Sequence, residues 1–277
     1  MRNIKIFYLS ILAVLFMVSC QKSYQVPDNN RIINTDSSNA GLLQKQVFTY
    51  LPENFENMLF EYAYDTAGRL IQRYYHAKIK NADGSIRVEQ DTLNYYRDTM
   101  GRIIRIGEIT DSIYLLVEYE GQTTRVKKVF DNLDSYTTEF EYGTTGHINR
   151  LNFYAHAPLP TDPKIKVGYH DHSYDAAGNM TEKTFYQDDN FNGNFDSPMR
   201  FRFEYDDQSN PRYPVDDALF PETWSLVSPN NNTRQLNFYS NPNVVNDTVN
   251  YIYTYDSQNR PVKCIKNSDT EIVYSYY

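Results

Sequence analysis

The amino-acid sequence predicts an all-β protein, an antiparallel meander of hairpins that curls into an open or closed barrel-like sheet. A Tyr-Asp phrase recurs along the chain at hairpin-like intervals, first as YAYDTAGRL at residues 62–70. Apolar or aromatic residues alternate with polar ones before the copies, which is the period of a half-buried strand. No stretch shows a convincing amphipathic helix, and the best short candidate is residues 215–220.

The first twenty residues are typical of a processing signal. Arg2 and Lys5 precede an apolar run at residues 6–18, and Cys20 follows almost directly. So short a run at the N-terminus favours a signal peptide over a membrane span. The tetrapeptide MVSC at residues 17–20 resembles the lipobox of bacterial lipoproteins. An ordinary secretory signal or an N-terminal anchor helix is the alternative.

The lipobox resemblance implies a signal peptide at residues 1–19, cleavage before Cys20 and a diacylglycerol on its sulfur. Such chains anchor a protein to the bilayer, since each buried CH₂ contributes about 0.8 kcal/mol. Gln21, not Asp, follows the cysteine, which favours the outer membrane, facing the periplasm or the cell surface. Residues 20–43 are then the lipidated cysteine and a flexible polar tether, and residues 44–277 form a single all-β domain.

Charge and cysteine content exclude several classes of protein. The net charge of −8 is the opposite of the basic footprint that nucleic acids require, so we expect no nucleic-acid partner. With Cys20 lipidated, Cys264 is the one cysteine left, so neither an intramolecular disulfide nor a cysteine-based metal cluster can form. We expect Cys264 to be a buried small apolar side chain; a reactive nucleophile is the alternative.

Each copy of the Tyr-Asp phrase predicts a strand, a tight turn and a strand. Asp favours the first position of a type I turn, and Gly at the fourth position adopts a positive φ cheaply. Phe60, Tyr62 and Tyr64 share one face of the first strand, and Leu70 restarts the apolar pattern after the turn. The copies are Asp65 with Gly68, Asp98 with Gly101, Asp175 with Gly178, Asp206 with Ser209 and Asp256 with Asn259, with degenerate copies at 119–120 and 142–146. We expect roughly twelve to sixteen strands in all.

The Tyr-Asp-x-x-Gly-Arg phrase resembles the YD repeat of Rhs and Tc-toxin shells and of teneurins. Those shells wrap far more strands around a cargo than this chain supplies. Over nearly the whole mature chain, the lipobox, the YD-like hairpins and an insertion at residues 209–231 are similar to an uncharacterised family of small Gram-negative lipoproteins. The resemblance implies the hairpin fold and is nearly silent on activity.

The stretch DDNFNGNFD at residues 188–196 is similar to a calcium-binding loop. Oxygen-bearing side chains recur at every second position and a glycine follows them, as in EF-hand loops. The candidate calcium ligands are Asp188, Asn190, Asn192, Asn194 and Asp196. Met199 stands where an EF-hand has its bidentate Glu, so water or another side chain would have to complete the shell. A hairpin tip rich in Asx turns is the alternative.

Two further stretches are candidate sites. His170 and His172 lie on one strand face as a possible half-site for zinc, and a solvated or turn-edge pair is the alternative. Residues 210–232 break the hairpin rhythm and contain Trp224, the only tryptophan. Trp224 and Tyr213 are candidates for a glycan platform, on which a sugar ring would stack. The alternative is a cap that seals the open end of the curled sheet.

Catalytic motifs are missing from the sequence. It contains no Gly-x-Ser-x-Gly elbow, no His-Glu-x-x-His and no phosphate-binding glycine loop. We therefore expect a non-catalytic structural or protein-interaction module, anchored at the outer membrane, with an envelope protein or glycan as its partner and calcium as the one candidate cofactor. A glycan-binding lipoprotein is the first alternative, and a carbohydrate-active enzyme is the second.

Overall fold

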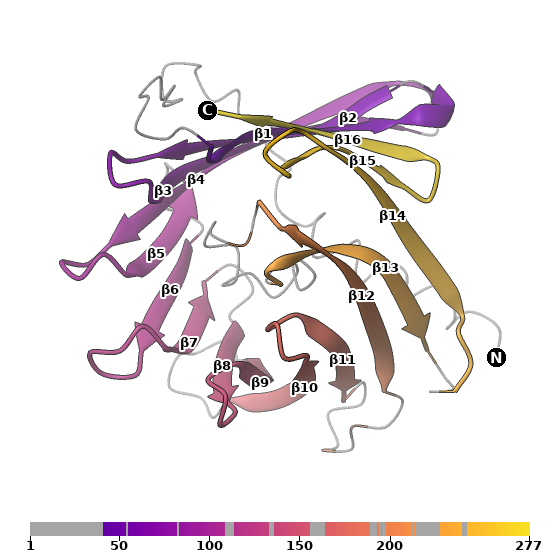
Figure 1. The fold of residues 1–277 in the computed structure, drawn as a ribbon. Helices are drawn as coiled ribbons and strands as arrows, with labels where there is room; N and C mark the ends of the chain where they lie inside the picture. The colour runs from indigo at the N-terminus through magenta and orange to yellow at the C-terminus, as the bar shows by residue number, and fades with distance from the viewer. Residues whose placement is uncertain are drawn as a thin grey trace.

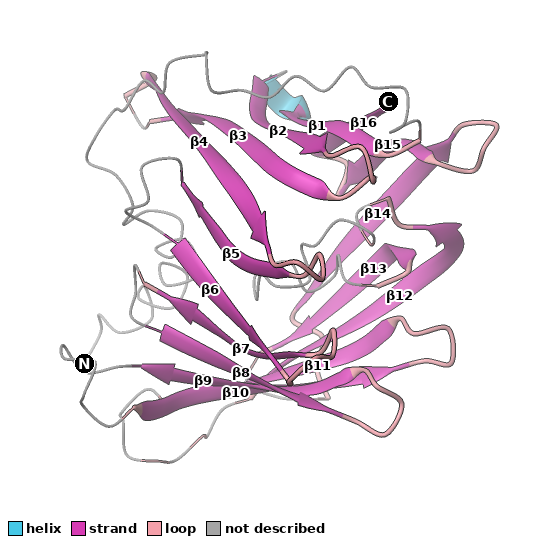
Figure 2. Ribbon diagram, turned by 90° about the vertical axis from the view of Figure 1, so that its left-hand side faces the viewer, coloured by secondary structure: helices cyan, strands magenta, loops and turns pink. Residues whose placement is uncertain are grey.

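The structure is a closed antiparallel barrel of sixteen strands (Figures 1 and 2). It is a computed structural model that describes residues 41–53, 55–81, 83–108, 114–132, 136–155, 164–188, 193, 195, 198–211, 213, 228–239 and 243–277. Each strand pairs with its neighbours in the chain, and β1 pairs with β16 to close the sheet. The predicted all-β meander is confirmed, and the sheet is closed.

The strands are β1 (Leu43–Tyr50), β2 (Phe55–Tyr64), β3 (Leu70–Lys80), β4 (Ile86–Arg97), β5 (Ile103–Glu108), β6 (Tyr114–Tyr119), β7 (Val126–Asp131), β8 (Tyr136–Tyr142), β9 (Ile148–Ala155), β10 (Ile165–Tyr174), β11 (Met180–Gln187), β12 (Met199–Ser209), β13 (Asn230–Phe238), β14 (Asp247–Tyr255), β15 (Pro261–Lys266) and β16 (Thr270–Tyr276). A short 3₁₀ helix, η3 (Leu51–Glu53), follows β1. In the described part of the chain, no helix is long and apolar enough to cross a membrane. The predicted signal peptide, Cys20 and the short helix at 215–220 lie outside the described residues.

Six turns at one end of the barrel, here called the YD rim, share one bonding pattern. They lie at 65–69, 98–102, 120–125, 143–147, 175–179 and 256–260, and in each the first N–H donates to the last carbonyl at 2.9 Å. The Asp65 carboxylate also accepts hydrogen bonds from the N–H groups of Ala67 and Arg69, both at 2.9 Å. Gly68 has a φ of 72°, and Asn259 has a φ of 60° at the same place in the last turn. The tight turns predicted at these copies are confirmed.

Tyrosine hydroxyls bridge the gaps between the turns of the YD rim. Each lies at or near the end of an even-numbered strand and donates to the carbonyl of the first residue of the preceding odd-numbered strand. The bridges are Tyr64 to Leu43 (2.8 Å), Tyr119 to Ile103 (2.8 Å), Tyr142 to Val126 (3.0 Å), Tyr174 to Ile148 (2.9 Å), Tyr205 to Met180 (2.7 Å) and Tyr276 to Pro261 (2.7 Å). Each turn joins an even-numbered strand to the strand that follows it, and each tyrosine joins an even-numbered strand to the strand that precedes it. Turns and tyrosine bridges therefore alternate around the rim and stabilise it together.

The inward face of the barrel wall holds the apolar core. The strand register places apolar residues of neighbouring strands opposite one another on this face: Val117 lies opposite Val129, and Phe140 lies opposite Leu151. The core cluster comprises Leu43, Tyr62, Tyr64, Leu70, Tyr95, Ile103, Ile106, Val117, Val126, Val129, Phe140 and Leu151. Burial of this aromatic and aliphatic surface is the main driving force that stabilises the fold.

The outward face of the wall carries charge. Ion pairs connect side chains across neighbouring strands, namely Lys128 with Glu118, Arg150 with Asp171, Arg202 with Glu182, Arg234 with Glu204 and Lys263 with Glu271. Lys164, just before β10, forms a further ion pair with Glu139 on β8. Transmembrane barrels have the reverse pattern, apolar outward and polar inward. The ion pairs favour contact with water, and exposed apolar side chains such as Ile86, Val88, Leu116 and Ile252 lie among them on this face.

Candidate functional site

The insertion between β12 and β13 is fastened to the YD rim by a ring of buried hydrogen bonds. Ser228, just before β13, is fully buried. Its hydroxyl donates to the Tyr205 hydroxyl (2.8 Å) and accepts from the Met180 N–H (3.0 Å), and the Tyr205 hydroxyl donates to the Met180 carbonyl (2.7 Å). At the base of the insertion, the Asn210 N–H donates to the Pro229 carbonyl at 2.7 Å. Both ends of the insertion are thus held in one place.

A second network ties the insertion to its neighbours on both sides. The side chain of Asn179 donates to the side-chain oxygen of Asn230 and accepts from its backbone N–H, both at 3.0 Å. On the other side, the Tyr255 hydroxyl donates to the Asp206 carboxylate, and the Asn231 N–H donates to the same carboxylate at 3.2 Å. The base of the insertion therefore spans from the 175–179 turn to β14.

The predicted turn between Asp206 and Ser209 does not form. β12 continues through Ser209, and the chain then enters the insertion. The residue at the turn-closing position is Ser, which adopts a positive φ less readily than the Gly or Asn at this position of the other Asp-containing copies. The Asp206 carboxylate still accepts the Gln208 N–H at 3.0 Å, so the local part of the motif survives while the hairpin closure is lost.

The proposed glycan platform is described only in part. Tyr213 lies close to the base of the insertion, where its N–H donates to the Asn210 carbonyl at 3.0 Å, and the residue is 51% exposed. Trp224 lies outside the described residues. The glycan platform stays a prediction, and Tyr213 is accessible to a ligand at the rim.

The candidate calcium loop lies at the opposite end of the barrel, because it joins β11 to β12 whereas the insertion follows β12. Asp188 is buried and its carboxylate accepts the Gly193 N–H at 2.6 Å. Asn190, Asn192, Asn194 and Asp196 lie outside the described residues. The Asp188 carboxylate thus accepts an N–H from a residue five positions later. This contact occurs both in calcium-binding loops and in hairpin tips rich in Asx turns, so it does not distinguish the two. Calcium binding therefore stays a prediction.

The histidine pair lies inside the wall and is not solvated. His170 and His172 are buried on the inward face, and His170 contacts Phe153 and Phe185 with ring centroids at 4.5 Å. Burial lowers the pKa of His172 to about 4, and burial also holds the pKa of His170 well below its ordinary value. Among the described residues, no group of three side chains could hold a metal ion there. The pair is part of the core.

Cys264 is a buried core residue on β15. Its side chain has no exposed surface, and burial raises the pKa of its thiol to about 12. A thiol with so high a pKa forms very little thiolate at neutral pH and is a poor nucleophile. The expectation of a buried, apolar cysteine is confirmed.

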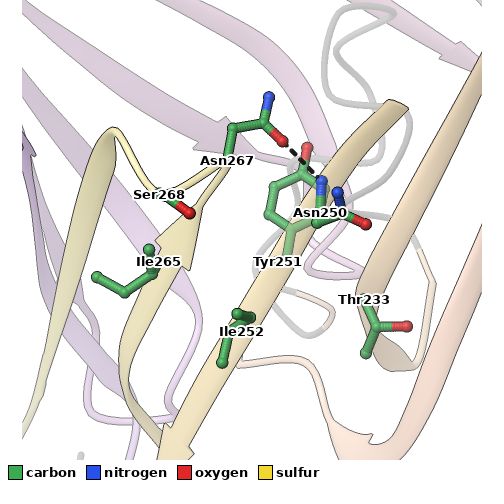
Figure 3. A pocket seen from close by; sticks show the side chains of 7 residues that line it. All are labelled: Thr233, Asn250, Tyr251, Ile252, Ile265, Asn267 and Ser268. Carbon is green, nitrogen blue, oxygen red and sulfur yellow. Dashed lines mark hydrogen bonds between the residues drawn. The ribbon is translucent and has the colours of Figure 1, made fainter. Parts of the chain in front are cut away.

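A depression on the outward face lies where β13 and β14 separate (Figure 3). Its volume is about 480 Å³, and it is lined by Thr233, Asn250, Tyr251, Ile252, Ile265, Asn267 and Ser268. Ile252 is 66% exposed. The lining contains amide, hydroxyl and apolar groups and no charged side chain.

Reasoning from the sequence missed this depression and the Asp206–Tyr255 contact. The Asn-rich run at 230–232 is the signal that could have indicated a polar junction. Asn250 and Asn267 are far from that run in sequence, and only strand pairing brings them to the same place.

Comparisons with known proteins show the fold alone. A porin-like protein from Bacteroides uniformis ATCC 8492 superposes with a TM-score of 0.52 at 11% identity, over 86% of this chain and 99% of that chain. The TcdB2-TccC3-TEV structure gives a TM-score of 0.31 at 14% identity, over 79% of this chain and 13% of that one. No family model and no curated protein matches the sequence. The chain therefore has a porin-like β-barrel fold, and its resemblance to lipoproteins with YD repeats stays a prediction.

Proposed function

We propose that this protein is a non-catalytic lipoprotein of the outer membrane, whose barrel is a rigid, water-exposed scaffold for binding an envelope protein. The observation that carries the proposal is the distribution of side chains on the barrel wall: ion pairs lie on the outward face and an aromatic core lies on the inward face, which is the opposite of a transmembrane barrel. A charged side chain on the lipid face of a barrel costs about 2–4 kcal/mol near the bilayer midplane. The wall therefore favours a barrel outside the lipid.

A barrel outside the lipid needs another attachment to the membrane, and the lipobox at Cys20 supplies one. β1 begins at the YD rim, since the carbonyl of its first residue accepts the Tyr64 hydroxyl there. The tether that precedes β1 thus leaves the barrel at the same rim as the insertion.

Affinity capture from detergent-solubilised envelopes tests this function. The bait is the full lipoprotein, and Cys20→Ala is the control for lipid-dependent capture. A stoichiometric protein partner is the expected result. Recovery of envelope polysaccharide without any protein would contradict a protein-interaction role.

Glycan binding is the second candidate, and the exposure of Tyr213 beside the insertion favours it. Aromatic side chains accessible at a rim are suited to stack on sugar rings. Binding of envelope polysaccharide that is lost in both Tyr213→Ala and Trp224→Ala would support this role. Unchanged binding in both variants would exclude the platform.

A further inference from the structure

The strand ladder between β13 and β14 ends before either strand does. The paired residues run from Asn237 opposite Asp247 to Arg234 opposite Asn250. β14 continues to Tyr255 and pairs with β15 along that length. Within the described residues, no strand pairs with β14 beyond Asn250 on the side that faces β13, and the two strands diverge there (Figure 1).

The backbone groups that face this split can be assigned from their neighbours. The Asn250 N–H donates to the Asn267 side chain at 2.8 Å, and the Asn250 carbonyl accepts the Asn267 N–H at 2.9 Å. Both groups of Asn250 are thus directed toward β15. Since successive residues of a strand direct their backbone groups to opposite neighbours, those of Tyr251 and Tyr253 are directed toward β13.

An open strand edge is a template for another strand, because unpaired N–H and C=O groups are costly when buried and bind an extended chain readily. The gap between β13 and β14 runs along β14 from Asn250 to Tyr255. At its Tyr255 end a side chain spans the gap, since the Asn231 side chain donates to the Tyr255 hydroxyl at 3.3 Å. The depression lies at the other end of the gap, at Asn250 and Tyr251, where the pairing of β13 with β14 stops. Open edge and depression therefore form one continuous surface.

We propose that this surface binds an extended peptide segment of a partner protein, which adds to the edge of β14 beside Tyr251 and Tyr253. The inference rests on the proposed protein-interaction function and assigns it a site. Tyr251 and Tyr253 are alternate residues of β14, and alternate residues of any extended chain are about 6.6–6.8 Å apart, so the backbone groups of an added strand have the same spacing.

The lining of the depression indicates the side chains of this partner. Ile252 and Ile265 give an apolar floor, and Asn250, Ser268 and Thr233 surround it with amide and hydroxyl groups. Because the lining carries no charged side chain, a partner segment with one uncharged apolar side chain over the isoleucines fits best. The volume of about 480 Å³ is within the range of roughly 300–1,000 Å³ that is common for ligand pockets.

Amide hydrogen exchange of the full chain, resolved to single residues, tests the open edge. In the free protein we expect the amides of Tyr251 and Tyr253 to exchange at least about tenfold faster than those of Ile252 and Thr254, which face β15. Equal protection at all four positions would overturn the proposal, because it would mean that the edge is already paired.

Binding is tested with linear peptides selected from a phage-displayed random library on the full chain. We expect a selected peptide to slow exchange at Tyr251 and Tyr253 at least about tenfold. Ile252→Lys should weaken its binding at least tenfold, whereas Ile86→Lys, at another exposed isoleucine in a strand, should not. Equal binding by both variants, or slowed exchange with envelope polysaccharide in place of peptide, would overturn the proposal.

The same variants separate this proposal from the proposed function. If Ile252→Lys captures the envelope partner as well as the unchanged protein does, the interaction role stands and this site is wrong. If no protein partner is captured by any form of the chain, the interaction role itself fails.

Discussion

Replacement of Ser228 by Ala removes one oxygen from the buried ring at the base of the insertion. That oxygen accepts the Met180 N–H at 3.0 Å and belongs to the hydroxyl that donates to Tyr205 at 2.8 Å. Ser228 has no exposed surface, so water cannot replace it. An unsatisfied buried donor costs about 1–3 kcal/mol, and a lost hydrogen bond costs about 0.5–1.5 kcal/mol. We expect the free energy of unfolding to fall by about 3 kcal/mol.

Thermal and urea unfolding measure this loss. For a chain of this size, about 3 kcal/mol corresponds to a fall in Tm of roughly 6–12 °C. Ser173→Ala, at an exposed serine on β10, is the matched control and should change stability by less than about 0.5 kcal/mol. Tyr205→Phe and the double variant complete a cycle, in which we expect a coupling of about 0.5–3 kcal/mol. If Ser228→Ala were as stable as Ser173→Ala, the ring would not hold the insertion.

The remaining predictions concern single side chains. Cys264 should resist alkylation at pH 8 in the native state and react fully after unfolding, because burial raises its pKa to about 12; rapid native labelling would show an accessible thiol. His172 has a native pKa of about 4 against an ordinary 6.5, so the unfolded state binds more protons between these values and stability should fall as pH drops through that window, by up to about 3 kcal/mol. Urea titrations should show a flatter pH dependence in His172→Gln, and an unchanged slope would refute the assignment. Gly101→Ala should cost more stability than Gly84→Ala, since both glycines have a φ above 80° but only the new Cβ at 101 meets Arg69, at 2.8 Å; equal melting temperatures would show that Arg69 moves away freely.

The hairpins could be predicted from the sequence because the information for each is local. Asp at the first turn position and Gly or Asn at the fourth determine the turn within five residues, and the two-residue period before it marks the strand. The copy at Asp206 has neither Gly nor Asn at the fourth position, where Ser209 stands, and it forms no hairpin. Hairpins could therefore be predicted correctly wherever the sequence has Asp at the first turn position and Gly or Asn at the fourth.

Features that depend on distant pairing could not be predicted in the same way. Closure requires β1 to meet β16 across the whole chain, and no local pattern encodes that contact. The burial of His170 and His172 depends on which face of the sheet turns inward. The proposed open edge at Tyr251 depends on where the pairing of β13 with β14 ends.

Membrane fractionation of Cys20→Ala tests the central claim most directly, that the barrel lies outside the lipid and is held to the membrane by its anchor. The unchanged lipoprotein and the variant are expressed in the native cell, and their membranes are washed with alkaline carbonate. Our account predicts that the unchanged protein stays with the membrane and that the variant is released as a folded, soluble barrel. A folded variant that resists extraction would contradict the account, because the barrel itself would then be embedded in the bilayer.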